Sequence, residues 1–342
     1  MPVAGLREEG WIRVEGALLL SRQQVAGLLG GAEFTAAIEQ AFRLLGEGKA
    51  APPGVLGIHT VEGGFHIKAG LLDLGTGYFA AKVNANFPQN PRRFGRPTIQ
   101  GVIVLCRADN GQLLALMDSM EITARRTAAA TALAAKHLAR RDSKTVTICG
   151  CGQMGRAQLR GLADVFTLTK VFAHDARPEQ AQKFAEELSE ELSLEIESTP
   201  DLRRAVRKSD ICVTCTTSRQ PLLGVSEVAP GTFVAAIGAD HPEKQEIDPL
   251  LMTKNTVVTD LTEQCAAMGD LHHAIARGMM RREKVHAELG EVVAGKRPGR
   301  ASREEIIIFD STGIALQDVA AAAVVYEKAR QQESGKEFDF AA

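Results

Sequence analysis

The stretch Thr145-Val-Thr-Ile-Cys-Gly-Cys-Gly-Gln-Met-Gly155 decides the fold class of this chain. It begins with apolar and β-branched residues, which are typical of a buried strand, and then satisfies the pattern G-x-G-x-x-G. In such a unit the first glycine permits a tight turn, the second lets a pyrophosphate approach, and the third lets a helix pack on the strand. The helix N-terminus favours phosphate, so the stretch predicts a dinucleotide site. The alternative is a glycine-rich turn that holds no cofactor.

An acidic residue follows where the ribose of a dinucleotide is bound. Asp175 ends the next strand-like run, twenty residues after Gly155. A carboxylate there accepts hydrogen bonds from the ribose 2′-hydroxyl and repels a 2′-phosphate, which favours NAD. Arg177 is able to pair with a 2′-phosphate, so NADP stays possible. The residues expected at the cofactor are Gly150, Gly152, Gln153, Met154, Gly155, Asp175, Arg177, Thr216, Thr217, Ser218 and Ser311.

Strands and helices alternate on both sides of this motif. The predicted strands are residues 146–149, 170–175, 211–216, 233–238, 256–260 and 304–309. The predicted helices are residues 121–140, 155–165, 178–192 and 313–329. Strands that alternate with helices imply right-handed βαβ units, so we expect an α/β fold with a Rossmann-type, doubly wound parallel sheet.

The first third of the chain has a different pattern. Residues 21–49 have the spacing of one or two helices. Short strand-like runs follow at 55–60, 64–69, 78–84 and 98–106, and Asp109-Asn-Gly111 is a hairpin signal before a run at 113–117. The pattern predicts an α+β domain built on antiparallel strands. The tail at 337–340 is predicted to be short and irregular.

Bulk composition excludes several classes of function. The length of 342 residues predicts about two domains, and a net charge of −2 argues against a nucleic-acid partner. No run reaches the roughly 18 apolar residues that span a membrane, and residues 1–15 have no secretory pattern, so a cytoplasmic location is expected. Four of the six cysteines lie in or beside apolar, strand-like runs, so buried reduced thiols are expected. Cys212 and Cys215 point to opposite faces of a predicted strand, so no metal site is expected.

Several motifs together resemble the ornithine cyclodeaminase/mu-crystallin family over nearly the whole chain. They are Lys82-Val-Asn-Ala-Asn-Phe-Pro88, Arg126-Thr-Ala-Ala-Ala130, the loop 150–155, Ile237-Gly-Ala-Asp240 and Phe309-Asp-Ser-Thr-Gly313. Runs 237–248 and 309–319 look closest to the archaeal-type alanine dehydrogenases of that family. The combination is specific for the family but not for a substrate, because the family contains cyclodeaminases, amino-acid dehydrogenases and cyclic-imine reductases.

The resemblance implies a homodimer in which each chain forms two domains with different roles. Residues 1–120 with 315–342 would form the substrate-binding and dimerisation domain, and residues 121–314 the Rossmann domain that binds NAD. Lys82 and Arg126 would hold the α-carboxylate of an amino or imino acid. Asp240 would then manage the proton or water at the nitrogen of the α-carbon, and we expect Asp240 and Lys82 to be the catalytic residues.

The same residues have a physical rationale of their own. Lys82 follows an apolar run and would need an anionic partner if buried, and the planar fork of Arg126 suits a carboxylate. Asp240 follows a predicted strand at the sheet edge where α/β proteins bind ligands. The alternatives are exposed charges at Lys82 and Arg126 and a turn aspartate at Asp240. Ser311 and Thr312 are expected to reach the nicotinamide side.

One departure from the family pattern concerns the carboxylate end of the site. Relatives usually carry an Arg or Lys just after the proline pair, whereas Pro52-Pro-Gly-Val-Leu-Gly-Ile-His59 contains no such cation. We expect Lys68, on a neighbouring strand, to supply the missing positive charge to the substrate. The alternative is an outward-facing strand lysine.

Two kinds of function remain open from the sequence. The first is an NAD(P)-dependent enzyme that forms an imino acid by hydride transfer, either as a cyclodeaminase or as an amino-acid dehydrogenase or imine reductase. The second is a non-catalytic NAD(P)H-binding protein like mu-crystallin. Retention of Lys82, Arg126 and Asp240 favours the enzyme, because a protein that only binds the cofactor does not need the aspartate.

Overall fold

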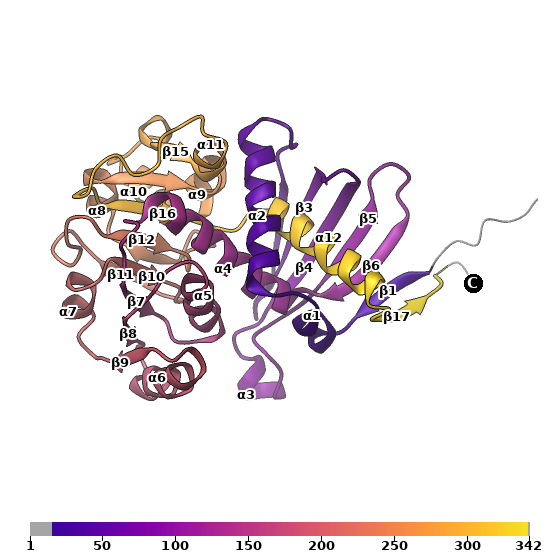
Figure 1. Ribbon diagram of the computed structural model, residues 1–342, viewed down its shortest axis with the longest axis horizontal. Helices are drawn as coiled ribbons and strands as arrows, with labels where there is room; N and C mark the ends of the chain where they lie inside the picture. Colours follow the sequence, from indigo (N-terminus) through magenta and orange to yellow (C-terminus); the bar gives the residue numbers. More distant parts are fainter. Residues whose placement is uncertain (1–15, 341–342) are drawn as a thin grey trace, which may run out of the picture.

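Two bodies, each built on its own sheet, make up the protein (Figure 1). The structure is a computed structural model that describes residues 16–340. The prediction for residues 1–15 therefore falls outside the described residues. None of the helices within 16–340 is long and apolar enough to cross a membrane.

The glycine motif belongs to a sheet of eight parallel strands in the order β15-β14-β16-β12-β10-β7-β8-β9. These strands are β7 (Thr145–Cys149), β8 (Lys170–His174), β9 (Glu195–Ser198), β10 (Ile211–Thr214), β12 (Phe233–Ala236), β14 (Thr256–Thr259), β15 (Ala287–Glu288) and β16 (Ile307–Asp310). The chain runs outward from β7 in one direction and then returns to β10 on its other side, which creates the switch point that binds ligands in such folds. The predicted doubly wound parallel sheet is confirmed.

Both faces of this sheet are buried. Phe233 and Ala235 of β12 enter one apolar core, and Val234 and Ala236 enter another. Burial on both faces explains why the strands of this half read as continuous apolar runs. The helices of this body are α5 (Gln153–Ala163), α6 (Pro178–Leu192), α7 (Leu202–Arg207), α8 (Pro249–Lys254), α9 (Thr262–Met268), α10 (Asp270–Ala276) and α11 (Leu289–Val293). A short parallel pair, β11 (Arg219–Leu223) and β13 (Gln245–Ile247), lies beside them.

The second body is built on a seven-stranded sheet in the order β17-β1-β6-β5-β4-β3-β2. Its strands are β1 (Ala17–Leu20), β2 (Gly54–His59), β3 (Gly64–Asp73), β4 (Gly77–Asn86), β5 (Ile99–Arg107), β6 (Leu113–Asp118) and β17 (Lys336–Phe338). Strands β2 to β6 are antiparallel neighbours, as predicted. Its helices are α1 (Arg22–Leu28), α2 (Gly31–Gly46), α3 (Asn90–Phe94) and α12 (Ala315–Gln331).

The predicted irregular tail is wrong. Residues 336–338 form β17, which pairs antiparallel with β1 so that Ala17 faces Phe338. β1 itself pairs parallel with β6, and its far edge leaves backbone groups that β17 satisfies. No local pattern reveals this pairing, because its partners lie at opposite ends of the chain.

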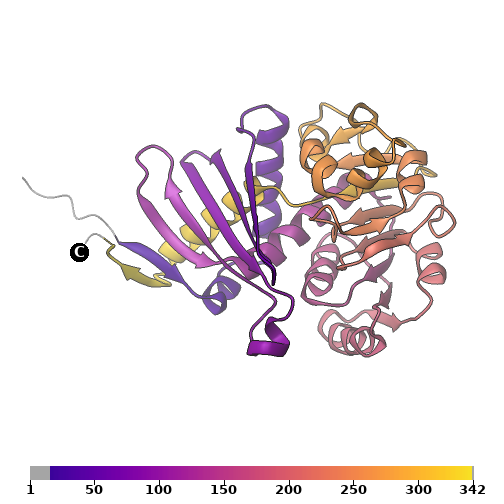
Figure 2. The ribbon, with the colours of Figure 1, turned by 180° about the vertical axis from the view of Figure 1, so that it is seen from behind.

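Helices α2 and α12 cover one face of the seven-stranded sheet, and α4 (Ser119–Leu138) lies where the two bodies meet (Figure 1). Ile103 and Leu105 point to the covered face and share a core with Phe34 and Ile38 of α2. Figure 2 shows the opposite face of the sheet, which no helix covers. The chain crosses between the bodies through α4 and again through residues 311–314, after β16 and before α12.

Two glycines set the contact between α2 and α11, which belong to different bodies. A Cβ atom on Gly46 would lie 1.9 Å from the backbone oxygen of Gly290 and 2.3 Å from its carbonyl carbon. Backbone atoms cannot move aside as a flexible side chain does, so this close approach requires glycine. The helices therefore touch through bare backbone at this point.

We expect Gly46→Ala to lower the free energy of unfolding by about 1–3 kcal/mol, because the new methyl group would force α2 away from α11. Denaturant unfolding of the full chain measures this change. Gly27→Ala is the matched control, since an added Cβ on Gly27 in α1 would have no atom within 4 Å among the described residues. The control should raise stability by up to about 1 kcal/mol. An unchanged stability for Gly46→Ala would contradict the proposed contact.

Candidate functional site

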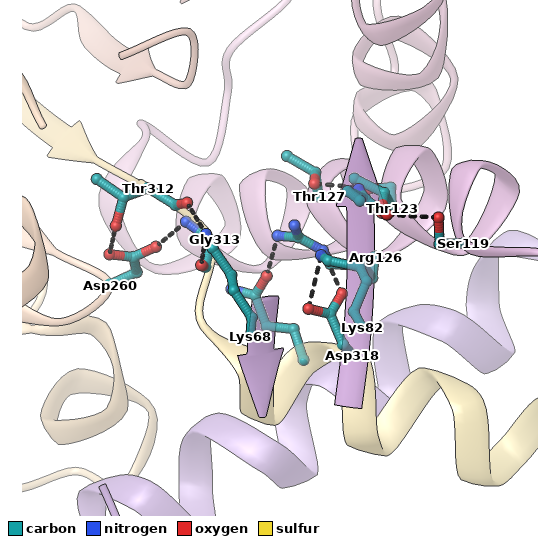
Figure 3. A network of polar contacts seen from close by, with 12 residues as sticks. Lys68, Lys82, Ser119, Thr123, Arg126, Thr127, Asp260, Thr312, Gly313 and Asp318 are labelled. Atoms are coloured by element: carbon teal, nitrogen blue, oxygen red, sulfur yellow. Dashed lines mark hydrogen bonds and ion pairs between the residues drawn. The ribbon is translucent and has the colours of Figure 1, made fainter. Parts of the chain in front are cut away.

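Three cationic side chains from different elements converge beside the N-terminal end of α12 (Figure 3). Lys68 of β3 and Lys82 of β4 are directly opposite each other in the antiparallel register, and Arg126 comes from α4. Lys82 is only 3% exposed and Arg126 only 4%. Like charges placed across a strand pair repel one another, so this arrangement needs a compensating anion.

Asp318 of α12 supplies one such anion. Its carboxylate lies 2.7 Å from Lys82 Nζ and accepts a hydrogen bond of 3.1 Å from Arg126 Nε. The neighbouring Gln317 accepts a bond of 2.5 Å from Arg126 Nη1. Burial alone would raise the pKa of Asp318, but the Lys82 and Arg126 charges outweigh it and hold the pKa below its usual value. The carboxylate therefore stays ionised inside the protein.

The linker before α12 is shaped to accept Arg126. Gly313 has a positive φ of 74°, which favours glycine. A Cβ atom there would lie 2.4 Å from Arg126 Nη1. The guanidinium therefore lies directly against this linker, and any side chain at position 313 would displace it.

Lys68 faces inward and not outward to solvent. Its Nζ donates to the backbone oxygens of Thr312 at 2.9 Å and of Gly313 at 2.6 Å (Figure 3). Gln264 donates to the same Gly313 oxygen at 3.0 Å, so strand β3 and helix α9 hold one linker from two sides. Burial, and then the nearby Arg126 charge, lower the pKa of Lys68.

The cluster carries more positive than negative charge. Lys68, Lys82 and Arg126 surround the carboxylate of Asp318, and buried Asp260 also attracts Lys68. Burial lowers the pKa of Lys82 to about 7, with help from Arg126 and Lys68 and against the attraction of Asp318. A buried excess of positive charge is unfavourable, so this site is suited to bind a small anion such as a carboxylate.

Asp240 reaches the same region from the other body. It follows β12, its side chain is 54% exposed, and it forms an ion pair of 2.5 Å with Lys244. Partial burial raises the pKa of Asp240, but Lys244, Lys68 and His66 lower it more, so the net shift is downward. Asp240 is thus an ionised, accessible carboxylate that faces the cation cluster across the junction of the two bodies.

The glycine loop has the geometry that a dinucleotide requires. Gly150 has a φ of 103°, which favours glycine. It also packs against the backbone of Cys215, whose oxygen would be 2.8 Å from a Cβ atom added to Gly150. A Cβ on Gly155 would lie 2.1 Å from the oxygen of Gly150, so α5 packs tightly on the loop. Gly152 instead faces open space among the described residues, and it begins α5 without a side-chain cap. The first-turn N–H groups, including those near Gln153 and Met154, therefore remain suited to a phosphate.

Asp175 lies beside this loop, just after β8. Its two carboxylate oxygens accept hydrogen bonds from the backbone N–H of Cys151 at 2.9 Å and of Arg177 at 3.0 Å. The Arg177 guanidinium is exposed, with its Nε 3.9 Å from Asp175. The carboxylate is thus fixed next to the pyrophosphate position, with Arg177 close to it.

The hydroxyl residues expected at the cofactor lie at the same sheet edge, and four of their hydroxyls already have partners. Thr216 donates to buried Glu246 at 2.7 Å, and Ser311 donates to buried Asp260 at 2.9 Å. Ser218 donates to a backbone oxygen, and Thr217 is exposed. Thr312 receives a bond from Gln264 at 2.7 Å.

Sequence reasoning overlooked several residues that shape this site. Asp318 and Gln317 stand out most, and a lone acid within the apolar stripe of the last helix could have revealed Asp318. Glu246 joins two strand ends, because it accepts bonds from the N–H of Thr216 at 2.6 Å and of Gly238 at 2.8 Å. No periodic pattern marks Glu246, since its role depends on two other strands.

Known proteins with the same architecture share this arrangement of elements. Residues 16–333 match the model of the ornithine cyclodeaminase/mu-crystallin family. An archaeal alanine dehydrogenase dimer with bound NAD is 38% identical, with a TM-score of 0.90 over 95% of this chain and 99% of that chain. A Δ1-pyrroline-2-carboxylate reductase of Thermococcus litoralis, in complex with NADH and L-proline, is 33% identical, with a TM-score of 0.89 over 94% and 100%. The iminosuccinate reductase of Paracoccus denitrificans, in complex with NAD+, is 32% identical, with a TM-score of 0.88 over 95% and 100%.

We expect the affinity of the cation cluster for a small carboxylate to fall as pH rises through about 7, where Lys82 loses its charge. Calorimetric titration with pyruvate between about pH 6 and about pH 9 measures the effect, which approaches tenfold in Kd per pH unit. Lys82→Arg keeps its charge and should flatten the change near neutrality. A pH-independent Kd in the unmodified protein would show that Lys82 does not bind the anion.

Proposed function

The chain belongs to the ornithine cyclodeaminase/mu-crystallin family, and from this premise we propose that it is an NAD-dependent enzyme acting at the α-carbon of a small amino acid or of its imine. One observation carries this proposal: a buried, net-positive cluster faces an accessible carboxylate, Asp240, at the carboxyl edge of a dinucleotide-type sheet. An anion site and an acid–base group beside a cofactor edge are the parts that chemistry at an amino acid requires.

Lys82, Arg126 and Lys68 bind the α-carboxylate of the substrate. Lys82 has three N–H donors and one acidic partner among the described residues, Asp318, so donors remain for a second carboxylate. Asp318 and Gln317 orient the guanidinium of Arg126 before substrate arrives. This preorganisation keeps the carboxylate in one place, which fixes the position of the α-carbon.

The cofactor occupies the glycine loop, and when bound it supplies or accepts the hydride at the α-carbon. Gly150, Gly152 and Gly155 hold the pyrophosphate, with Gln153 and Met154 in the first turn of α5. Asp175 favours NAD through the ribose hydroxyls. The strand ends beside this loop carry hydroxyl side chains that line the cofactor side of the site: Thr216, Thr217, Ser218 and Ser311.

Asp240 exchanges a proton with the nitrogen of the substrate or with the water that attacks the imine. Its ion pair with Lys244 keeps it deprotonated in the absence of substrate, so it is ready to act as a base toward an ammonium group. In the reductive direction the same carboxyl group returns a proton to nitrogen. Lys68 lies close enough to stabilise the carboxylate form.

Net oxidation or reduction is the outcome we propose, in place of cyclodeamination. Among solved structures, the dehydrogenase and reductases named above are 32–38% identical to this chain, whereas a lysine cyclodeaminase is 26% identical. The three relatives are named for substrates that differ in their side chains. Their names therefore leave open which side chain the substrate of this protein carries. We also propose a cytoplasmic location, where the six free cysteines remain thiols.

Incubation with NAD and a panel of amino acids should produce NADH and ammonia together, or NADH with a cyclic imine from proline. NADH absorbance and ammonia are measured separately, and ammonia without NADH would identify a cyclodeaminase instead. Asp240→Asn should lower kcat by about 10²- to 10⁴-fold, because it removes the acid–base group. Asp142→Asn, an exposed aspartate paired with Arg303, is the control and should leave kcat unchanged.

A homodimer is the assembly we propose, joined through the uncovered face of the seven-stranded sheet. Leu56, Phe65, Phe79 and Val102 are large apolar residues exposed on this face. A hollow of about 540 Å³ lies there, with Val83 among the residues that line it. An apolar face of this kind marks an interface, and a second copy of the same sheet is complementary to it.

Val102→Asp should convert the dimer to a monomer, because it places a charge at the centre of the apolar face. Light scattering coupled to gel filtration measures the mass. Val165→Asp introduces the same charge at a position of similar exposure on the other body and should leave the dimer intact. A dimer that survives Val102→Asp would place the interface elsewhere.

A further inference from the structure

A second polar row lies next to the cation row on the inner face of the seven-stranded sheet. Gly57, His66, Asn84 and Gly101 are in register across β2, β3, β4 and β5. This row is two residues along the strands from Lys68 and Lys82, a distance of about 6.5–7 Å. Because its outer members are glycines, only His66 and Asn84 place side chains beside the anion site.

The side chain of Asn84 is held in place by a hydrogen bond to its amide oxygen. Its Oδ1 accepts a hydrogen bond of 2.6 Å from buried Ser119. The glycine at position 101 makes room for this arrangement, since a Cβ there would lie 2.1 Å from Asn84 Oδ1. The bond fixes the amide oxygen on Ser119, and the amide N–H groups of Asn84 are donors for a ligand.

His66 belongs to a group of three imidazoles at the junction of the two bodies. Its ring centroid lies 5.8 Å from that of His59 and 6.4 Å from that of His241, the residue after Asp240. Burial lowers the pKa of His66, and His59, Lys68 and His241 lower it further against the attraction of Asp240. The neutral ring still donates one N–H to an acceptor.

The hydrogen-bond donors of the second row favour an acceptor group on the side chain of the substrate. Asp318 and Asp260 both attract Lys68, so the α-carboxylate of the substrate offsets the positive charge that remains on Lys68, Lys82 and Arg126. Lys244 already neutralises Asp240. A methyl or ring side chain would leave the donors of the second row facing an apolar group, which is unfavourable.

We propose that the side chain of the substrate ends in a second carboxylate, bound by His66 and Asn84, so that the enzyme acts on a short imino dicarboxylic acid and its amino acid. This inference rests on the proposed function and names its substrate class. Lys82 and Arg126 hold one carboxylate, and the polar row one step along the strands holds the other. The imino carbon then lies between them, facing Asp240.

Reductive amination by the full-length enzyme tests this directly. NADH oxidation is measured with ammonia and either oxaloacetate, 2-oxoglutarate or pyruvate, and with Δ1-pyrroline-2-carboxylate alone. The better dicarboxylic acid should exceed pyruvate and the cyclic imine in kcat/KM by about 100-fold, since a site built for a polar group strongly rejects analogues that lack it. A larger kcat/KM for pyruvate or for the cyclic imine would overturn the inference while the proposed function stands. Turnover of no imino acid at all would overturn both.

Substitution of His66 separates recognition of the side chain from the chemistry. His66→Leu should lower kcat/KM for the dicarboxylic acid by about 10- to 100-fold and change that for pyruvate by less than about threefold. His66→Gln keeps an N–H donor and should recover most of the loss. His286→Leu, on the other body, is the matched control. An equal loss for both substrates in His66→Leu would indicate a general structural role and overturn the assignment.

Binding without turnover gives an independent measurement. Calorimetry with NADH present compares L-malate with L-lactate, which share the α-hydroxy acid group and differ in the second carboxylate. We expect L-malate to bind at least about tenfold more tightly, and this ratio should shrink in His66→Leu and in Asn84→Leu. Equal affinities for the two acids would overturn the inference whatever the kinetic result.

Discussion

The buried carboxylate of Asp318, held between Lys82 and Arg126, ties the elements of this protein together more than any other contact. It joins β4, α4 and α12, which come from distant parts of the chain. Removal of one partner from a buried ion pair leaves an uncompensated charge and typically costs about 3–5 kcal/mol. The same contacts leave a net positive charge, so the interaction that assembles the fold also creates the anion site.

The second constraint lies in the linker of residues 311–314, where the chain passes from one body to the other. Buried Asp260 accepts a bond of 2.6 Å from the N–H of Gly313, and Lys68 binds the oxygen of the same residue. The linker is thus held from the parallel sheet and from the antiparallel sheet at once. Because both bodies contribute to it, the cofactor edge and the anion site keep a defined relation to each other.

Local patterns predicted the parts of the site that act within a few residues. The spacing of Gly150, Gly152 and Gly155 reports turn geometry and helix packing, both of which depend on neighbouring backbone. Asp175 follows a strand at a characteristic distance and lies beside the loop. Asp318 escaped notice for the opposite reason, since its partners Lys82 and Arg126 are far away in sequence. The strand at 336–338 was missed in the same way, because its hydrogen bonds go to β1.

The amino-acid sequence is sufficient to specify the parallel sheet, the loop for a dinucleotide and the types of charged residue available to a substrate. Those features follow from periodicity and from chemistry that each residue carries alone. The folded chain was needed to show that Lys68 and Lys82 lie opposite each other, that Asp318 balances part of their charge, and that His66 and Asn84 form the next row. Strand register and helix docking set these relations, because a shift of one residue would turn every side chain to the other face of the sheet.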